Sequence, residues 1–328
     1  MKLIDLTHTF SIHTPGWVGY PSPKLSYIQR HATNGIVSQF LETPLHAGTH
    51  LDGEMHIVSG GKDIASVPLT TLCREGVIVD LSDQMDDWSV ITPKQVTDRM
   101  EVKKGDIVVF HTGWHRFYNG RPEEDEERYF LRHPGGGRDL AEWIVEMQFA
   151  WTAVDCGSGD HPMNTTIRTK RPDATREYER RMGKKVEEVW PESDLFVMHR
   201  VPFRAGITHV ENLGGDVEHA LNKRCLIGAF PIPIEGGEAS PCRIVAFLND
   251  QGAWLIGSCA GGAPRAIRRA AERWRVRAAD ASAPASTAES GVTHASGTGC
   301  TTCIRPAPAA GNMPRRAVAR ADDGAAGP

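Results

Sequence analysis

The chain has 328 residues, of which 40% are hydrophobic and 24% charged, as is ordinary for a globular protein with a sizeable core. The formal net charge of −4 is unevenly divided, because residues 262–328 contain ten Arg, no Lys and five acidic residues. That segment therefore carries a formal charge of +5, which leaves a charge of −9 for residues 1–261. A mildly acidic main part argues against nucleic acid as a partner.

Seven cysteines are scattered along the chain, an odd number without the regular spacing of a disulfide framework. Cys156, Cys225 and Cys242 lie in apolar runs and are expected to be buried thiols. The opening MKLIDLTHTF lacks the apolar stretch of a signal peptide, and no apolar run reaches the length of a membrane span. We therefore expect a cytoplasmic protein without a membrane partner.

Strands are predicted at intervals through the first 250 residues. Several are continuous apolar runs, such as 77–79 and 107–110, which are typical of strands covered on both faces. The predicted strands are 3–7, 37–42, 76–81, 106–111, 151–156, 226–232 and 243–248.

Helices are predicted between these strands. Thr92 and Pro93 are typical of an N-cap and a first helical position. Residues 139–149 carry apolar side chains at helical spacing, which predicts an amphipathic helix packed on a sheet. Residues 173–185 are nearly all polar and indicate a solvated helix or an oligomer contact. Periodicity by itself therefore supports an α/β fold.

The composition changes after about residue 262. Ala, Arg, Pro, Gly, Ser and Thr dominate there and the apolar periodicity disappears. This predicts one globular domain over residues 1–261 and a low-complexity, disordered tail over residues 262–328. Cys300 and Cys303, with His294, form a metal-like pattern in the tail, but a single C-x-x-C is weak evidence and an accidental pair is preferred.

Three histidines and one aspartate fall within eleven residues of the segment HAGTHLDGEMH. These residues are His46, His50, Asp52 and His56. Imidazole and carboxylate groups are ligands that Zn and Mn accept readily. In an extended chain these four even-numbered residues would point to one side, whereas in a helix only His46 and His50 would share a face well.

Gly48 and Gly53 argue against a regular helix in this segment. A turn or extended loop that brings the four side chains together is therefore favoured. The alternative is a polar loop with surface histidines. It is less favoured because polar side chains clustered on one face are costly to bury unless they bind something or pair with each other.

The pattern His46-x-Gly-Thr-His50-x-Asp52-x-x-x-His56 resembles the signature of the cyclase-like metal-dependent hydrolases, which include bacterial kynurenine formamidase and isatin hydrolase. Further segments are similar to that family in the same order, over roughly residues 1–250. The first motif is specific and the others are supportive. The others are Asp5-Leu-Thr-His8, His111-Thr-Gly-Trp114, Val154-Asp-Cys-Gly-Ser-Gly-Asp160, Glu211-Asn-Leu213 and Pro241-Cys-Arg-Ile-Val245.

The resemblance implies a mixed sheet with flanking helices in a swivelling β/β/α-type architecture, and a homodimer or higher homo-oligomer. It implies that His46, His50 and Asp52 bind a divalent metal ion, Zn or Mn. Asp52 would also bridge to a second ion where two are bound. His199 and Glu211, twelve residues apart, match the His and Glu that complete the two-metal sites of the family.

Some of these assignments have rivals. His161 and His209 are rival ligands for the position of His199, and Glu211 could instead cap the helix-like region 216–222. The resemblance also implies that His56 transfers a proton. Trp17 resembles an aromatic side chain that lies against the substrate, although plain packing of Trp17 is an equal alternative.

The chain departs from the family at two places. Gly53-Glu54 follows Asp52 where Ala-Pro is common, so Glu54 either adds a carboxylate near the metal ions or faces water. Residues 161–198 form a long polar segment, for which a lid, a dimer arm or a specificity loop is expected. In the family a neighbouring subunit reaches the pocket, so Trp17 or residues 162–198 are candidates to act on a partner's site.

We predict a metal-dependent amidohydrolase that cleaves the C–N bond of a small cyclic or N-formyl amide through metal-bound hydroxide, with His56 as the proton donor. Trp17, Phe40 and Trp114 are candidates to line the substrate pocket. A lactone or ester hydrolase, or a metal-dependent lyase, is the alternative on the same site. A non-catalytic metal-dependent binding module is the alternative of another class, and His56 argues against it because pure binding needs no proton transfer.

Overall fold

The computed structural model describes residues 1–249. The predicted tail, the domain boundary at residue 261 and the Cys300–Cys303 pattern lie outside these residues. Within residues 1–249, no helix is both long and apolar enough to cross a membrane.

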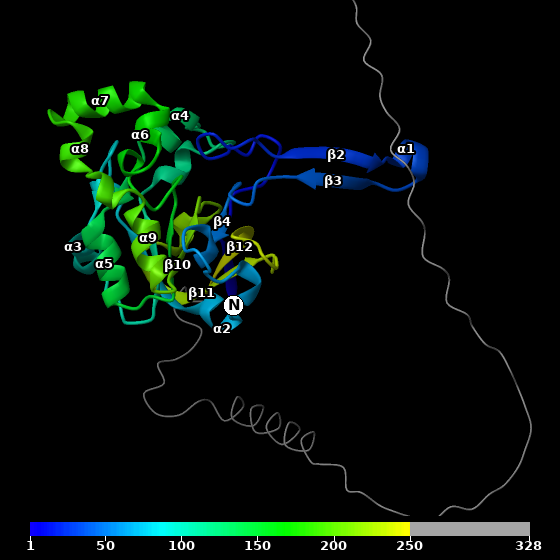
Figure 1. The fold of residues 1–328 in the computed structure, drawn as a ribbon. Helices are drawn as coiled ribbons and strands as arrows, with labels where there is room; N and C mark the ends of the chain where they lie inside the picture. Colours follow the sequence, from blue (N-terminus) through cyan, green and yellow to red (C-terminus); the bar gives the residue numbers. More distant parts are fainter. Residues whose placement is uncertain (250–328) are drawn as a thin grey trace, which may run out of the picture. The chain divides into compact units, whose positions relative to one another are not determined.

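The main sheet closes into a barrel (Figure 1). The strands of this sheet lie side by side in the order β1-β12-β11-β5-β7-β9-β10-β4. Strand β4 also pairs with β12, and this pairing closes the ring. Pairing is parallel from β5 through β7 and β9 to β10 and antiparallel elsewhere. The strands are β1 (Lys2–Asp5), β4 (His50–Asp52), β5 (Cys73–Asp80), β7 (Ile107–His111), β9 (Trp151–Val154), β10 (Thr208–Glu211), β11 (Lys223–Pro231) and β12 (Ala239–Leu248).

Two small sheets accompany the barrel. The first is a hairpin of β2 (Lys24–Gln29) and β3 (Ser38–Glu42), joined through the short helix α1 (His31–Asn34). The second pairs β6 (Val90–Ile91) with β8 (Gly135–Gly136).

Helices pack against the outer face of the parallel strands (Figure 1). Helix α3 begins as predicted, because Thr92 forms a reciprocal capping box with Gln95 and Pro93 occupies the first turn. Helix α5 buries Leu140 and Ile144, as its apolar spacing predicted. The helices are α2 (Leu69–Leu72), α3 (Pro93–Arg99), α4 (Glu126–Leu131), α5 (Arg138–Glu146), α6 (Ile167–Lys170), α7 (Pro172–Met182), α8 (Val186–Val189) and α9 (Val197–Arg204).

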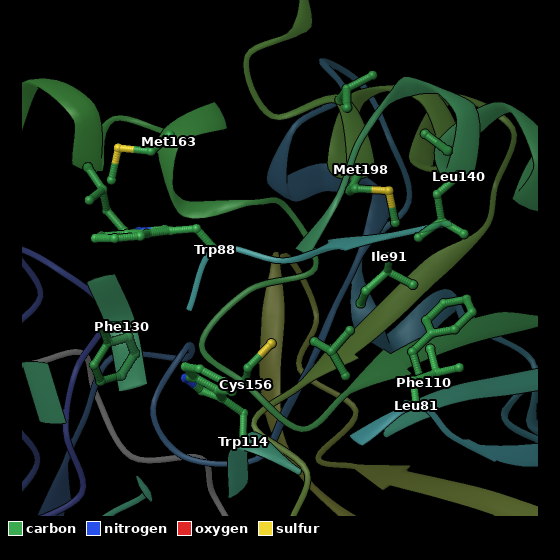
Figure 2. Packing of buried hydrophobic residues seen from close by; sticks show 14 of the residues in the cluster. Leu81, Trp88, Ile91, Phe110, Trp114, Phe130, Leu140, Cys156, Met163 and Met198 are labelled. Carbon is green, nitrogen blue, oxygen red and sulfur yellow. The ribbon is translucent and has the colours of Figure 1, made fainter. Parts of the chain in front are cut away.

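Alternate residues of each strand enter two separate hydrophobic cores. Ile78 and Val109 belong to a cluster to which every strand of the barrel contributes, so this cluster fills the barrel interior. Val79 and Phe110, on the opposite face, belong to a second cluster between the barrel and the helices. Figure 2 shows part of this second cluster. Labelled there are Leu81, Trp88, Ile91, Phe110, Trp114, Phe130, Leu140, Cys156, Met163 and Met198.

The predicted α/β class with a mixed sheet and flanking helices is confirmed. Each predicted strand overlaps an observed one, and Cys156, Cys225 and Cys242 are buried as expected. The predictions missed β2, β4, β6, β8 and β10. The polar stretch 173–185 is largely helix α7, which is not merely solvated because Ala174 and Tyr178 are buried.

Candidate metal centre

Two short neighbouring strands present the core of the site. In the antiparallel pair β4–β10, Asp52 lies opposite His209, and His50 lies opposite Glu211. The residues between them, Leu51 and Val210, point into the barrel interior. Because side chains alternate along a strand, the two histidines and two carboxylates share the outer face of the barrel.

Two further histidines reach the same place from outside these strands. His46 precedes β4 across a turn in which Gly48 adopts a positive φ of 66°. Ala47, next to His46, forms a β-bridge with Gly16, which holds the turn against the segment containing Trp17. His199 extends from α9 and is buried, so it is not the surface residue of the alternative interpretation.

Two histidine nitrogens converge on one oxygen of Asp52. The Asp52 Oδ1 atom lies 2.8 Å from His46 Nδ1 and 3.2 Å from His50 Nε2. The two ring nitrogens are themselves 3.2 Å apart. We name this set the His46 group; such spacings suit atoms that share one ion at about 2.0–2.2 Å each.

A second group converges on the other oxygen of Asp52. The Asp52 Oδ2 atom lies 3.3 Å from His209 Nε2 and 3.6 Å from His199 Nε2. Glu211 Oε1 lies 3.1 Å from His209 Nε2 and 3.7 Å from His199 Nε2. All four residues are buried. We name this set the His209 group, and Asp52 belongs to both groups.

The hydrogen bonding of these atoms fits a bound cation. Asp52 is fully buried, yet neither carboxylate oxygen has a hydrogen-bond partner, and the buried Nε2 of His209 has none either. A buried charged group without hydrogen bonds is costly unless something neutralises it. The close approaches to the histidines therefore suit lone pairs directed at a common ion. Two nitrogen-and-oxygen sets that share a carboxylate fit Zn or Mn.

Contacts behind the histidines fix which ring nitrogen faces the centre. His50 Nδ1 donates to the Gly48 carbonyl at 2.8 Å, and His199 Nδ1 donates to Asp160 Oδ2 at 2.6 Å. Each bond leaves Nε2 directed inward. Asp160 lies in the later Asp-x-x-Ser-x-Asp segment, so the motif contained this residue although its role could not be read from the sequence.

Glu238 is a participant that the sequence did not indicate. Its Oε2 atom lies 2.6 Å from His46 Nε2 and 2.8 Å from His56 Nδ1. His56 ends a short 3-10 turn, Glu54–His56, and its ring centroid is 4.3 Å from that of His46. Glu238 is not part of a recognisable motif, and it lies 192 residues from His46 along the chain.

The electrostatics of the site favour positive charge. Burial opposes protonation of His46, but the charge of Asp52 and the contact with Glu238 outweigh it and raise the pKa of His46 to about 11. Burial likewise opposes ionisation of Asp52, yet the nearby charges of His46 and His50 hold the pKa of its carboxyl well below the usual range. A site that holds protons this strongly also attracts a divalent cation.

The centre lines a pocket with a volume of about 270 Å³. Trp17 lines one wall of the pocket. Its ring makes an edge contact with Tyr20, and the ring of Tyr20 makes an edge contact with His46. Residues from the 161–198 segment line another wall, namely Thr166, Lys170 and Phe196. The pocket therefore joins candidate metal ligands with aromatic and cationic side chains of the same chain.

Two aromatic residues expected to line the pocket lie elsewhere, and Glu54 does not add a carboxylate to the ligand groups. Trp114 does not line the pocket, because it is buried in the core below the helices (Figure 2). Phe40 lies on the β2–β3 hairpin and is 55% exposed. Glu54 contacts Lys62 and belongs to neither metal-ligating group.

The two residues considered as alternatives to His199 lie in different places. His209 lies beside His199 in the His209 group rather than replacing it. His161 lies elsewhere: its Nε2 donates to the Trp88 carbonyl and its Nδ1 accepts from the Met163 amide. With both ring nitrogens engaged in a fully buried position, the pKa of His161 is lowered to about 3, chiefly by burial. Glu211 is a strand residue, not a helix cap.

Comparisons with known proteins place the chain in a family. Residues 4–161 match the model of the family described as "Putative cyclase". No curated protein matches the chain.

Solved structures share the fold. Isatin hydrolase A from Ralstonia solanacearum is 19% identical, with 75% of this chain and 91% of that chain covered at a TM-score of 0.59. Isatin hydrolase A from Labrenzia aggregata, bound to benzyl benzoate, is 16% identical, with coverage of 75% and 93% and a TM-score of 0.58. A predicted metal-dependent hydrolase from Bacillus stearothermophilus is 20% identical, with coverage of 75% and 97% and a TM-score of 0.53.

Proposed function

From its membership of the cyclase family, which residues 4–161 carry, we propose that this protein is a metal-dependent amidohydrolase. The observation that carries the proposal is the shared carboxylate of Asp52: both of its buried oxygens lack hydrogen bonds and each faces a different group of ligands. His56 lines the same pocket. A binding module would need the ligands but not a histidine placed for proton transfer.

We assign one role to each group of ligands. His46, His50 and Asp52 hold one divalent ion, and the nearby His56 is kept for proton transfer. Asp52, His199, His209 and Glu211 hold a second ion, with Zn and Mn as candidates. When bound, such an ion supplies Lewis acidity that polarises a carbonyl group and makes water nucleophilic at neutral pH. Asp160 and the Gly48 carbonyl keep the rings of His199 and His50 oriented.

His56 is the proposed proton-transferring residue. It is partly exposed to the pocket, unlike the buried ligands, with 24% of its side chain accessible. Its Nδ1 is engaged by Glu238, so Nε2 is the atom that passes a proton to the leaving nitrogen. Imidazole suits this role because it exchanges protons near neutral pH.

The proposed substrate is a small cyclic or N-formyl amide attached to an aromatic ring. A pocket of about 270 Å³ accommodates a molecule of this size, and Trp17 and Phe196 supply apolar walls. Isatin hydrolases with the same fold act on isatin, a cyclic amide, which makes isatin a natural first compound. N-formylkynurenine represents the N-formyl class.

The test combines elemental analysis of the purified protein with assays on isatin and N-formylkynurenine, before and after chelation. We expect one or two equivalents of Zn or Mn and chelator-sensitive hydrolysis of one compound, with one solvent ¹⁸O atom incorporated per product. Turnover without ¹⁸O would indicate a lyase. A protein that binds no Zn or Mn under any loading condition would contradict the proposal.

We further propose that the protein is a homodimer joined through the β2–β3 hairpin. Both faces of this hairpin are exposed, and Figure 1 shows it projecting from the barrel. Leu25, Tyr27, Ile28, Phe40 and Leu41 are each about half exposed or more. An isolated two-stranded hairpin is marginally stable in water, so we expect a partner to cover its exposed apolar side chains.

Sedimentation equilibrium tests this arrangement. We expect a dimer for the wild-type protein and a monomer for the double variant Ile28→Glu, Phe40→Glu. Leu69→Glu is the matched control, since Leu69 is 72% exposed on α2, away from the hairpin. A wild-type monomer, or a dimer that survives both hairpin substitutions, would contradict the proposal.

A further inference from the structure

We propose that Glu238 is a positioning residue that fixes His56 relative to the metal centre, an inference that rests on the proposed function. One carboxylate oxygen, Oε2, is within hydrogen-bond distance of both His46 and His56. Neither the family signature nor any predicted ligand set includes Glu238. Its role follows from the fold alone.

The backbone holds Glu238 at the edge of the site. The Glu238 carbonyl accepts a hydrogen bond from the Gly53 amide at 2.8 Å, directly after β4. The next residue, Ala239, pairs with Asp52 in the β12–β4 ladder. The carboxylate is therefore anchored to the same strand that carries the shared ligand, by the pairing that closes the barrel.

The contact with His46 sets which nitrogen is available to an ion. His46 Nδ1 faces Asp52 Oδ1 at 2.8 Å, while Nε2 lies 2.6 Å from Glu238. When Nε2–H donates to the carboxylate, Nδ1 keeps its lone pair toward the centre. A carboxylate behind a metal-ligating histidine orients the ring and increases its strength as a ligand.

The contact with His56 sets the tautomer of the proton-transferring ring. Nδ1–H of His56 donates to Glu238 at 2.8 Å, which leaves Nε2 to exchange a proton in the pocket. A histidine base oriented by a carboxylate at its other nitrogen is a general arrangement for activating such a group.

Sharing one oxygen couples the two rings. His46 and His56 donate to the same atom, and their ring centroids are 4.3 Å apart. A displacement of the carboxylate would therefore move both the ligand and the proton-transferring residue. Glu238 is 36% exposed at its side chain, so it can be replaced without leaving a large internal cavity.

The experiment compares Glu238→Ala and Glu238→Gln with the control Glu235→Gln, an exposed glutamate in the same loop. The zinc dissociation constant, by chelator competition, reports on His46. We expect it to rise about 10- to 100-fold in Glu238→Ala, less in Glu238→Gln, and not at all in the control. The kcat on the hydrolysed compound should fall by a similar factor.

Repeating Glu238→Ala in a His56→Ala background separates the two contacts. The loss of zinc affinity should persist there, because it acts through His46, whereas the further loss of kcat should disappear. A merely structural role for Glu238 would lower the residual kcat in both backgrounds. Unchanged zinc affinity and kcat in Glu238→Ala, equal to those of Glu235→Gln, would overturn the proposal.

The tautomer of His56 is measured by ¹⁵N NMR without metal or substrate. We expect Nδ1–H for His56 in the wild-type protein and loss of that preference in Glu238→Ala. A wild-type Nε2–H tautomer, or one indifferent to Glu238, would overturn the inference even if the protein hydrolyses amides. Absence of hydrolysis together with the expected tautomer would instead count against the proposed function alone.

Discussion

The described residues contain a second buried cluster of histidines and a carboxylate, which differs from the candidate metal centre in its hydrogen bonding. His111, His115 and Asp155 also lie close enough together to hold an ion. They lie at and just beyond the carboxyl ends of the parallel strands β7 and β9. We name these three residues the strand-end cluster and compare it with the six-residue centre of the His46 and His209 groups.

The carboxylate of the strand-end cluster is already engaged. Asp155 Oδ1 accepts hydrogen bonds from the Thr112 amide at 2.8 Å and the Thr112 hydroxyl at 2.6 Å. Its Oδ2 lies 3.2 Å from His115 Nδ1 and 3.6 Å from His111 Nε2. Asp52, by contrast, has no hydrogen bond to either oxygen.

The histidines of the two clusters also differ in their partners. His111 Nδ1 lies 3.0 Å from Asp80 Oδ1, and His115 Nε2 lies 3.5 Å from Glu218. Each histidine of the strand-end cluster thus has a carboxylate near both ring nitrogens, although the Nε2 of His111 forms no hydrogen bond. Proximity of His and Asp therefore does not by itself make a metal site. An unpartnered carboxylate beside a pocket distinguishes the candidate centre from the strand-end cluster, whose carboxylate is hydrogen-bonded.

The largest expected effect comes from Asp52→Asn. Because Asp52 supplies one oxygen to each ligand group, this isosteric change should abolish stoichiometric metal binding and lower kcat/KM by about a thousandfold or more. Elemental analysis and steady-state kinetics measure the two effects, with circular dichroism to verify folding. Asp98→Asn, at an exposed helix position, is the control. Two tightly bound ions in Asp52→Asn would refute the shared-ligand assignment.

Replacing His56 separates chemistry from metal binding within the centre. His56→Ala should lower kcat by about 10² to 10⁴-fold while the metal content stays as in the wild-type protein. The exposed His219 offers a matched control as His219→Ala. If His56→Ala retained full turnover, the proton-transferring residue would have to be sought elsewhere in the pocket.

Asp155→Asn tests the strand-end cluster. Removing one charge from a buried, paired group should lower the free energy of unfolding by about 3 kcal/mol. Metal content and kcat should not change, because the cluster is structural. Urea denaturation and elemental analysis provide the measurements. Loss of an equivalent of metal from Asp155→Asn would erase the distinction between the two clusters.

The pH dependence of metal affinity has the smallest expected effect. The raised pKa of His46, about 11, means that the metal-free site holds a proton throughout the neutral range. An ion must displace this proton, so affinity should fall as pH falls, about tenfold per pH unit for one proton released. Isothermal titration calorimetry at pH 8 and pH 6 should give about a 100-fold difference. A constant affinity over this range would contradict the assignment of His46.

The strands that carry the site were the ones the sequence did not predict. Strands β4 and β10 are three and four residues long, and histidine and carboxylate side chains interrupt their apolar character. Apolar periodicity therefore found β5, β7 and β9 but passed over the two strands with the ligands. The segment 46–56 was expected as a turn or extended loop, whereas it comprises a turn, a strand and a 3-10 turn.

The sequence by itself determined the chemical character of the centre. His46, His50, Asp52 and His56 lie so close along the chain that almost any compact conformation brings them near one another. Their residue types suit a divalent metal ion. The apolar runs likewise determined most strands of the sheet and the amphipathic helix α5.

Only the tertiary structure decided how the centre is completed. Closure of the barrel through β12 and β4 brings Glu238 to His46 and His56, and the β4–β10 register sets His209 opposite Asp52. These contacts join residues more than 150 positions apart, so no local spacing encodes them. Whether a histidine turns a nitrogen toward the candidate metal centre, as His209 does, or toward a backbone carbonyl, as His161 does, depends on which strand or helix packs against it.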